Sequence, residues 1–230
     1  MHTSHKIGLF FRVPRGVTLA IAPFNYPLNL AVSKIIPALI TGNTVVFKPP
    51  TNGTLLGCWL GRCFRSAQFP PGVINVVAGR GGEIGHVLTT NPEIDVIGFT
   101  GSFQVGQQLL VSNPSAHTFL ELGGKDVMVV LADADVAQAA AAIVAGGLSY
   151  SGQRCTAIKL VACHEQVADQ LIAVLTTLVQ RLQVGKAADN SFIVPLINQK
   201  SADYVMALIA DALAHGATLV MGNRHQDNLV

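Results

Sequence analysis

The feature that most constrains the fold is an alternation of short apolar runs with segments of helical pattern. In the first half of the chain, five runs rich in β-branched and aromatic residues share this character: 16–22, 43–49, 72–79, 95–102 and 117–124. Helices are expected between them, each close to a Gly, Pro or Asn, at 28–40, 55–67, 83–89 and 105–110. Because the runs are apolar without strict alternation, they predict a parallel sheet covered on both faces and built from βαβ units.

A second α/β unit is expected after residue 122. It starts with the strand VMVVL, followed by an alanine-rich helix for which Asp133 is the expected N-cap. The strand KLVACHE, helices at 166–182 and 201–213, and the strand ATLVMG continue the pattern. The final NRHQDNLV completes neither a helix nor a strand. We therefore expect two α/β units, 1–122 and 123–230, of which the second is incomplete.

Composition directs the functional interpretation toward small molecules. Half of the 230 residues are hydrophobic and only 12% are charged, which excludes a disordered chain. The net charge of +2 comes from scattered Lys and Arg, so neither a nucleic-acid-binding patch nor a basic membrane-binding helix is predicted. The N-terminus lacks the apolar run of a signal peptide, and Lys34 and Pro37 interrupt the apolar stretch 28–40. A cytoplasmic protein without a transmembrane helix is expected.

The four cysteines provide one candidate nucleophile. Cys58, Cys63, Cys155 and Cys163 form no CxxC pair, so reduced thiols and no bound metal are expected. In SGQRCTA, Cys155 follows Arg154 in a glycine-containing loop, where positive charge and backbone amides favour a thiolate. The other three cysteines lie in expected helices or strands and are interpreted as inert packing residues.

Two charged residues end expected strands, where open parallel sheets bind ligands. Lys48 is followed by two prolines, which stop the strand and direct the ammonium away from the sheet. Glu121 is followed, after Leu122, by two glycines, which leave room for a ligand and little cover for the carboxylate except a cleft. Burial there would suit Glu121 to general-base work. The alternatives are a solvated lysine at the strand end, and an ion pair between Glu121 and Lys125 or another base.

Two glycine-containing turns are candidate phosphate sites. GRGGEIG, residues 79–85, has the spacing GxGxxxG, one residue longer than the dinucleotide fingerprint, and glycines of a tight turn explain it equally well. In FTGSFQVGQ, Gly101 and Ser102 follow an apolar strand and precede a helix whose first amides would hold an anion. The alternative is that Ser102 only caps this helix.

Five motifs in a fixed order resemble the aldehyde dehydrogenase superfamily: PFNYP, VVFKPPT, GFTGS, ELGGK and GQRCTA. SYSGQRCTAIK and the segment 194–212 are most similar to its NADP-dependent non-phosphorylating glyceraldehyde-3-phosphate dehydrogenase branch. The resemblance implies an α/β fold with a parallel-sheet, Rossmann-like cofactor domain at 1–122, incomplete at its N-terminal side. Part of a second α/β catalytic domain, at 123–230, would follow.

The resemblance also implies a reaction and its residues. Cys155 matches the family nucleophile, Glu121 the residue that activates the deacylating water, and Asn25 the amide that stabilises the oxyanion. The aldehyde would form a thiohemiacetal and then a thioester on Cys155, with hydride passing to the nicotinamide. Arg154 and Thr156 would bind the substrate, expected to be glyceraldehyde 3-phosphate, with another small aldehyde such as a semialdehyde as the alternative.

The expected cofactor is NADP, with NAD as the second possibility. Lys48 matches the family lysine at the adenosine ribose, and Thr51 stands where many NAD-preferring relatives carry a glutamate. His86 stands where similar enzymes usually carry an aspartate; the two interpretations are that it adds a donor for the 2′-phosphate and that the change has no functional meaning. The cofactor contacts implied by the resemblance are Ala22, Phe24, Lys48, Thr51, Gly81, His86, Gly101, Ser102 and Leu122.

The largest departure from the family pattern is length. The family's N-terminal segment and its later EExFGP motif have no counterpart in the 230 residues, so we expect a fragment of a homo-oligomeric enzyme. The competing interpretation, from a different functional class, is a non-catalytic remnant or an interaction fragment.

Overall fold

The structure, a computed structural model, describes residues 2–3 and 6–230. Its contacts divide the chain into two compact units, 1–122 and 123–230. The first residues include a two-stranded antiparallel sheet of β1 (His2–Thr3) and β2 (Lys6–Ile7).

The first unit is built on a five-stranded sheet in the order β5-β4-β3-β6-β7, in which every pair of neighbours is parallel. The strands are β3 (Val17–Ile21), β4 (Thr44–Lys48), β5 (Ile74–Val76), β6 (Val96–Gly101) and β7 (His117–Leu122). The helices are α1 (Asn29–Ile40), α2 (Thr54–Ser66), α3 (Gly81–Thr89) and α4 (Phe103–Ser112), with a short 3-10 helix η1 (Thr51–Gly53) before α2. The predicted α/β fold with a parallel sheet is therefore confirmed.

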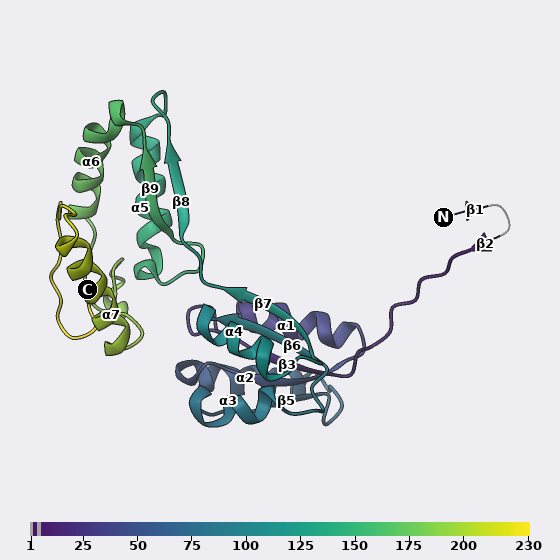
Figure 1. Ribbon diagram of the computed structural model, residues 1–230. Coiled ribbons are helices and arrows are strands. Elements are labelled where there is room, and N and C mark those ends of the chain that lie inside the picture. The colour runs from purple at the N-terminus through teal and green to yellow at the C-terminus, as the bar shows by residue number, and fades with distance from the viewer. Residues whose placement is uncertain (1, 4–5) are drawn as a thin grey trace. The chain divides into compact units, whose positions relative to one another are not determined.

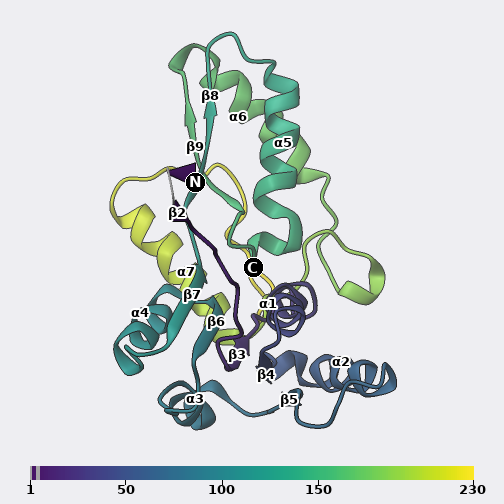
Figure 2. The same ribbon diagram turned by 90° about the vertical axis from the view of Figure 1, so that its right-hand side faces the viewer.

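Two apolar clusters hold helices on opposite faces of this sheet (Figures 1 and 2). On one face, Val45 and Phe47 of β4 are fully buried against Ile35 of α1 and Phe64 of α2. On the other face, the fully buried Leu19 and Ile97 pack with side chains of α3 and α4. Burial of an aliphatic or aromatic side chain of this kind stabilises by about 1.5–3 kcal/mol, so this packing accounts for the layered arrangement.

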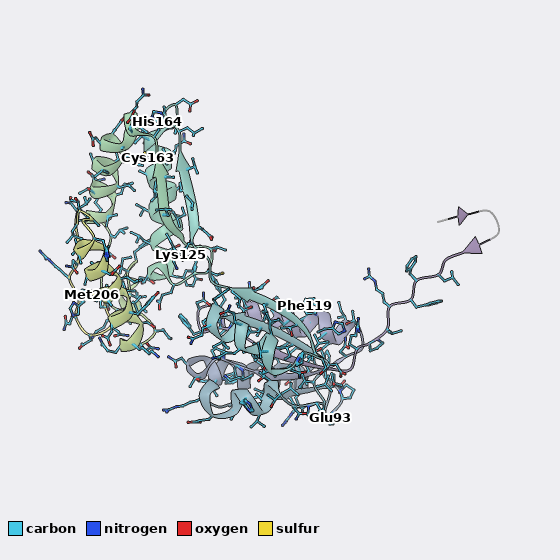
Figure 3. All side chains as sticks on the ribbon, viewed as in Figure 1. Glu93, Phe119, Lys125, Cys163, His164 and Met206 are labelled. Atoms are coloured by element: carbon cyan, nitrogen blue, oxygen red, sulfur yellow. The ribbon has the colours of Figure 1, made fainter. Side chains whose placement is uncertain are left out.

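The edge strand β7 differs from the expectation of a sheet covered on both faces. Its residues alternate between exposed and partly buried, and Phe119 is 68% exposed (Figure 3). Leu120 and Leu122 pack with the cluster that includes α4, whereas the opposite side of β7 has no cover among the described residues. The run HTFLEL thus forms a half-covered edge strand, which its alternating polar residues allow.

The second unit contains a two-stranded parallel sheet of β8 (Asp126–Val130) and β9 (Ile158–Cys163). Its helices are α5 (Val136–Leu148), α6 (Glu165–Gln180) and α7 (Gln199–Ala214), with short 3-10 helices η2 (Ser149–Gly152) and η3 (Ala187–Asp189). One face of the sheet packs on α5 and α6 through a core that includes Val130, Ala140 and Leu171 (Figure 1).

Two expectations for the second unit are wrong. The N-cap of α5 is Asp135 rather than Asp133: its carboxylate accepts hydrogen bonds from the amides of Ala137 and Gln138, both at 3.0 Å. Both aspartates precede the alanine-rich run, and only the backbone conformation decides which one caps it. The segment ATLVMG, 217–222, forms no strand. A strand needs a hydrogen-bonding partner, and no described segment pairs with this one.

No helix in the described part of the chain is both long and apolar enough to cross a membrane.

Candidate active site

Because all neighbouring strands of the first unit are parallel, the carboxyl ends of its five strands lie at one edge of the sheet. The chain runs outward from β3 through β4 to β5 and then returns to the other side of β3 as β6 and β7. Such a reversal of strand order leaves a crevice at the carboxyl ends, which is where open α/β sheets bind ligands. The predicted site residues that lie in the last positions of a strand or follow its end at this edge are Ala22, Phe24, Asn25, Lys48, Thr51, Gly81, Gly101, Ser102, Glu121 and Leu122.

Lys48 is a buried cation at the carboxyl end of β4. Only 6% of the residue is exposed, and its Nζ donates to the carbonyl oxygen of Pro49 at 3.1 Å. No carboxylate of the described residues pairs with it. Burial therefore lowers the pKa of Lys48 from its usual value. The solvated lysine that we gave as the alternative is contradicted, and an anionic ligand would supply the missing charge.

Replacing Lys48 with methionine is expected to stabilise the protein at neutral pH. Methionine keeps the apolar stem and removes a buried charge, a change worth about 1 kcal/mol or more. Because the folded-state pKa of Lys48 is lowered, the folded protein gains stability relative to the variant as the pH rises toward 10.5, the unfolded value. Urea unfolding at several pH values measures this, with exposed Lys200→Met as the control. A Lys48→Met variant that is less stable than the original protein would contradict the conclusion that the Lys48 charge is buried without compensation.

Glu121 lies in a hydrogen-bonded chain that starts on α1. Lys34 Nζ donates to the carbonyl oxygen of Leu30 at 3.1 Å and to Thr100 Oγ1 at 2.5 Å. Thr100 Oγ1 in turn donates to Glu121 Oε2 at 3.2 Å, and the Lys34 ammonium is 4.0 Å from the same oxygen. Desolvation lowers the pKa of Lys34, and the negative charge of Glu121 partly offsets this. The arrangement orients one carboxylate oxygen through a hydroxyl and a nearby cation.

One expectation about Glu121 is corrected by this geometry. Its side chain is 67% exposed in the described structure, so the predicted burial is not observed. Its cationic partner is Lys34 rather than Lys125, which agrees with the alternative of an ion pair with another base. In the sequence, Lys34 is evident only as a charge that interrupts an apolar helix, and Thr100 only as part of GFTGS. A lysine in an otherwise apolar helix was the available signal, since a buried amine needs polar partners.

The two glycine-containing turns start helices α3 and α4. A side chain on Gly79 would clash with Ile84, whereas Gly81, at the start of α3, has open space around it. Ser102 caps α4, with its hydroxyl accepting from the amide of Val105 at 3.4 Å, as the alternative predicted. The first amides of any helix lack intrahelical acceptors, so both turns still present donors at the carboxyl-end edge of the sheet.

The remaining cofactor candidates differ in accessibility. Ala22 is buried and Phe24 is 40% exposed, while Thr51 is exposed in η1. Leu122 packs toward α4. His86 is exposed on α3, five residues after its start and therefore about 7.5 Å along the helix axis from Gly81. Its contact with a ribose stays a prediction.

The loop of Cys155 belongs to the second unit and is fixed by contacts on its N-terminal side. Tyr150, Ser151 and Gly152 have left-handed φ values of 56°, 53° and 70°, a run that non-glycine residues rarely adopt. The Ser151 hydroxyl donates to the carbonyl oxygen of Val194 and accepts from its amide, both at 2.8 Å. Two strained residues, Tyr150 and Ser151, are thereby held in one conformation just before the predicted nucleophile.

Arg154, Cys155 and Thr156 form an accessible turn of this loop. Cys155 and Arg154 are half-buried and Thr156 is exposed. Arg154 Nη2 donates to the carbonyl oxygen of Gly146 at 2.7 Å, near the end of α5, whereas its Nε is buried without a partner among the described residues. A buried, unpaired guanidinium nitrogen is unusual and is consistent with a ligand-binding role.

The other cysteines do not all fit the packing interpretation. Cys163 is half-buried and packs with the core of the second unit. Cys58 and Cys63 are exposed on α2, so describing them as buried packing residues was wrong. Both lie on the solvent side of an amphipathic helix, where sequence periodicity does not distinguish a small thiol from an alanine.

Comparison with known proteins gives consistent matches along the chain. Residues 1–229 match the model described as Aldehyde dehydrogenase family. The NADP-dependent glyceraldehyde-3-phosphate dehydrogenase of Streptococcus equinus is 47% identical over 225 residues, which are 98% of this chain and 47% of the relative. The corresponding protein of Scenedesmus vacuolatus is 45% identical over 212 residues, 92% of this chain and 91% of the relative.

A solved structure gives the same match. It is that of NADP-dependent glyceraldehyde-3-phosphate dehydrogenase from Bacillus halodurans C-125 complexed with NADP, which is 52% identical with a TM-score of 0.93. The match covers 95% of this chain and 46% of that one. The chain thus spans about half the length of the Streptococcus and Bacillus proteins.

Proposed function

Because the chain belongs to the aldehyde dehydrogenase family, we propose that it carries the cofactor-binding edge and the nucleophile of an NADP-dependent aldehyde-oxidising enzyme. The observation that supports this most strongly is the buried, uncompensated Lys48 at the edge where the predicted cofactor residues gather. A phosphate on the cofactor ribose would provide the charge that Lys48 lacks.

The proposed reaction uses Cys155 as the nucleophile. Its thiolate attacks the aldehyde carbon and forms a thiohemiacetal, whose oxyanion is stabilised by the Asn25 amide and the backbone N–H of Cys155. NADP, when bound, supplies the hydride acceptor. The carbonyl carbon is left as a thioester on Cys155. Glu121 then takes a proton from water, and the resulting hydroxide attacks the thioester carbon. The C–S bond breaks, the carboxylic acid leaves, the Cys155 thiolate is restored, and Glu121 releases its proton to solvent.

The direct test is to incubate the protein with NADP and glyceraldehyde 3-phosphate and to follow NADPH absorbance. The expected products are NADPH and 3-phosphoglycerate in equal amounts. Turnover with another small aldehyde, such as a semialdehyde, but not with glyceraldehyde 3-phosphate would keep the reaction class and change the substrate. No turnover with any small aldehyde would contradict the proposal.

We propose glyceraldehyde 3-phosphate as the substrate, with Arg154 at its phosphate. The position of Arg154 directly before Cys155 supports this, as do the names of the similar proteins. Replacing Arg154 with leucine is expected to raise KM for glyceraldehyde 3-phosphate by about ten- to a hundredfold, because one charge-assisted contact is worth about 1.5–3 kcal/mol. KM for unphosphorylated glyceraldehyde should change much less. Equal effects on both substrates would contradict the phosphate contact, and exposed Arg181→Leu is the control.

We propose NADP rather than NAD because Lys48 pairs with no carboxylate among the described residues. Thr51, three residues later, is neutral and exposed. Replacing Thr51 with glutamate is expected to lower the ratio of kcat/KM for NADP to that for NAD by at least about tenfold, because the new carboxylate repels a doubly charged 2′-phosphate. Exposed Ser66→Glu, at the far end of α2, should leave the ratio unchanged. An unmoved ratio in Thr51→Glu would contradict the assignment.

One observation favours the alternative of an interaction fragment. The face of the β8–β9 sheet away from α5 and α6 exposes Val127, Val129 and Leu160 by 49%, 62% and 57%. Exposed apolar sheet faces promote association. Size-exclusion chromatography with the NADPH assay discriminates the two: an associated protein without turnover would support the fragment, and a protein with turnover would exclude it.

A further inference from the structure

Lys159 lies four residues after Cys155 and hydrogen-bonds to the loop of Cys155 from its C-terminal side. Its Nζ donates to the carbonyl oxygen of Cys155 and to that of Ala157, both at 2.9 Å. Between these carbonyls, the amide of Ala157 donates to the carbonyl oxygen of Arg154 at 3.2 Å and completes a turn. One ammonium therefore holds two peptide groups of the same short turn.

The strand that carries Lys159 is irregular at this residue. Asp126 pairs with Ile158 and Val127 pairs with Leu160, so Lys159 has no partner on β8. Ile158 lies against α5, as does the face formed by Val161 and Cys163, which shows that the alternation of β9 shifts here. Such a bulge changes the direction in which a side chain points and often occurs beside active sites.

The contacts made by Lys159 are strong ones for a loop. Hydrogen bonds from a charged donor are about twice as strong as neutral ones, and the donor here is fixed to a paired strand. The N-terminal side of the loop is held independently by Ser151 and by Gln153, whose Oε1 accepts from the amide of Ile197 at 2.9 Å. Cys155 thus lies between two anchors, and Lys159 is the one that contacts its own peptide group.

We propose that Lys159 is a positioning residue for Cys155, an inference that rests on the proposed role of Cys155 as the nucleophile. By binding the carbonyl of Cys155, the ammonium fixes the peptide plane that follows the thiol. By binding the carbonyl of Ala157, it fixes the exit of the turn. The thiol and the backbone N–H of Cys155 then keep one orientation for attack. Because misplacement of a reacting group by about 1 Å lowers a rate by about a hundredfold, this restraint affects kcat.

Lys159→Met tests the proposal through kinetics. We expect kcat to fall about ten- to a hundredfold while KM for NADP stays within about twofold, because the predicted cofactor residues lie in the other unit. Lys159→Arg should recover most of the loss, since a guanidinium can donate to both carbonyls. Lys186→Met, at an exposed lysine of the same unit, is the matched control. A Lys159→Met enzyme with a wild-type kcat, or one that Arg does not rescue, would overturn the proposal.

Hydrogen–deuterium exchange separates this inference from the proposed function. Amides of residues 149–158 should exchange faster in Lys159→Met and normally in Lys186→Met, whether or not the protein turns over an aldehyde. If Cys155→Ser were fully active, the proposed function would fail while this exchange result still held. Unchanged exchange in Lys159→Met would overturn the positioning role itself.

Discussion

Replacing Cys155 with serine is expected to abolish aldehyde oxidation, with a loss in kcat of at least about a thousandfold. A serine hydroxyl is a much weaker nucleophile than a thiolate, and it can form only an oxygen ester that is slower to hydrolyse. Cys155 lies in a half-buried turn that is held by hydrogen bonds on both sides. The substitution therefore replaces the sulfur atom with oxygen and keeps the conformation of the loop.

Binding of NADP should survive the Cys155→Ser change, because the predicted cofactor residues belong to the other unit. The measurement is the dissociation constant for NADPH by fluorescence, expected within about twofold of the unchanged protein. Cys58→Ser, at an exposed cysteine on α2, should oxidise the aldehyde at the normal rate. A Cys155→Ser protein with more than a tenth of the original kcat would show that the nucleophile is elsewhere.

Replacing Glu121 with glutamine is expected to slow release of the acid by about a hundredfold or more, the usual contribution of a general base. Glutamine keeps the size of the side chain and an oxygen that can accept the hydrogen bond from Thr100, but it cannot take a proton from water. The first turnover should remain fast, so NADPH should appear in a burst that equals the concentration of active protein.

The control for this change is Glu93→Gln, at an exposed carboxylate of the same unit (Figure 3). It should show neither a burst nor a loss of rate. A Glu121→Gln protein with a normal steady-state rate would contradict the role of this carboxylate. A slow first turnover would indicate instead that Glu121 acts before the thioester forms.

The parallel sheet and the edge at which the candidate ligand residues gather follow from sequence pattern. The runs 43–49 and 95–102 have apolar centres, VVF and VIGF, and end in Gly, Pro or Ser, and both form strands buried on two sides. Once parallel pairing is predicted, topology alone brings Lys48 and Ser102 to the same edge. This inference needs no knowledge of side-chain contacts, which is why it could be made from residue order.

Side-chain contacts between elements that are far apart in the sequence could not be predicted. Lys34 extends from α1 across the sheet to Thr100 and Glu121, which are 66 and 87 residues further along the chain. Nothing in local sequence fixes the meeting of these three side chains. The bulge at Lys159 is equally invisible, because a one-residue change of register leaves no mark in an apolar strand. Local pattern therefore predicted which residues lie at the strand ends better than it predicted their side-chain contacts.

The most direct test of the proposed chemistry is to measure, during turnover, the mass of the peptide that contains Cys155. The Glu121→Gln protein is mixed with NADP and glyceraldehyde 3-phosphate, quenched with acid within the burst, and digested for mass spectrometry. We predict a phosphoglyceroyl thioester on the peptide that contains Cys155, in an amount equal to the NADPH formed, and none on the peptides with Cys58, Cys63 or Cys163. A full burst of NADPH with an unmodified Cys155 would contradict the thioester mechanism.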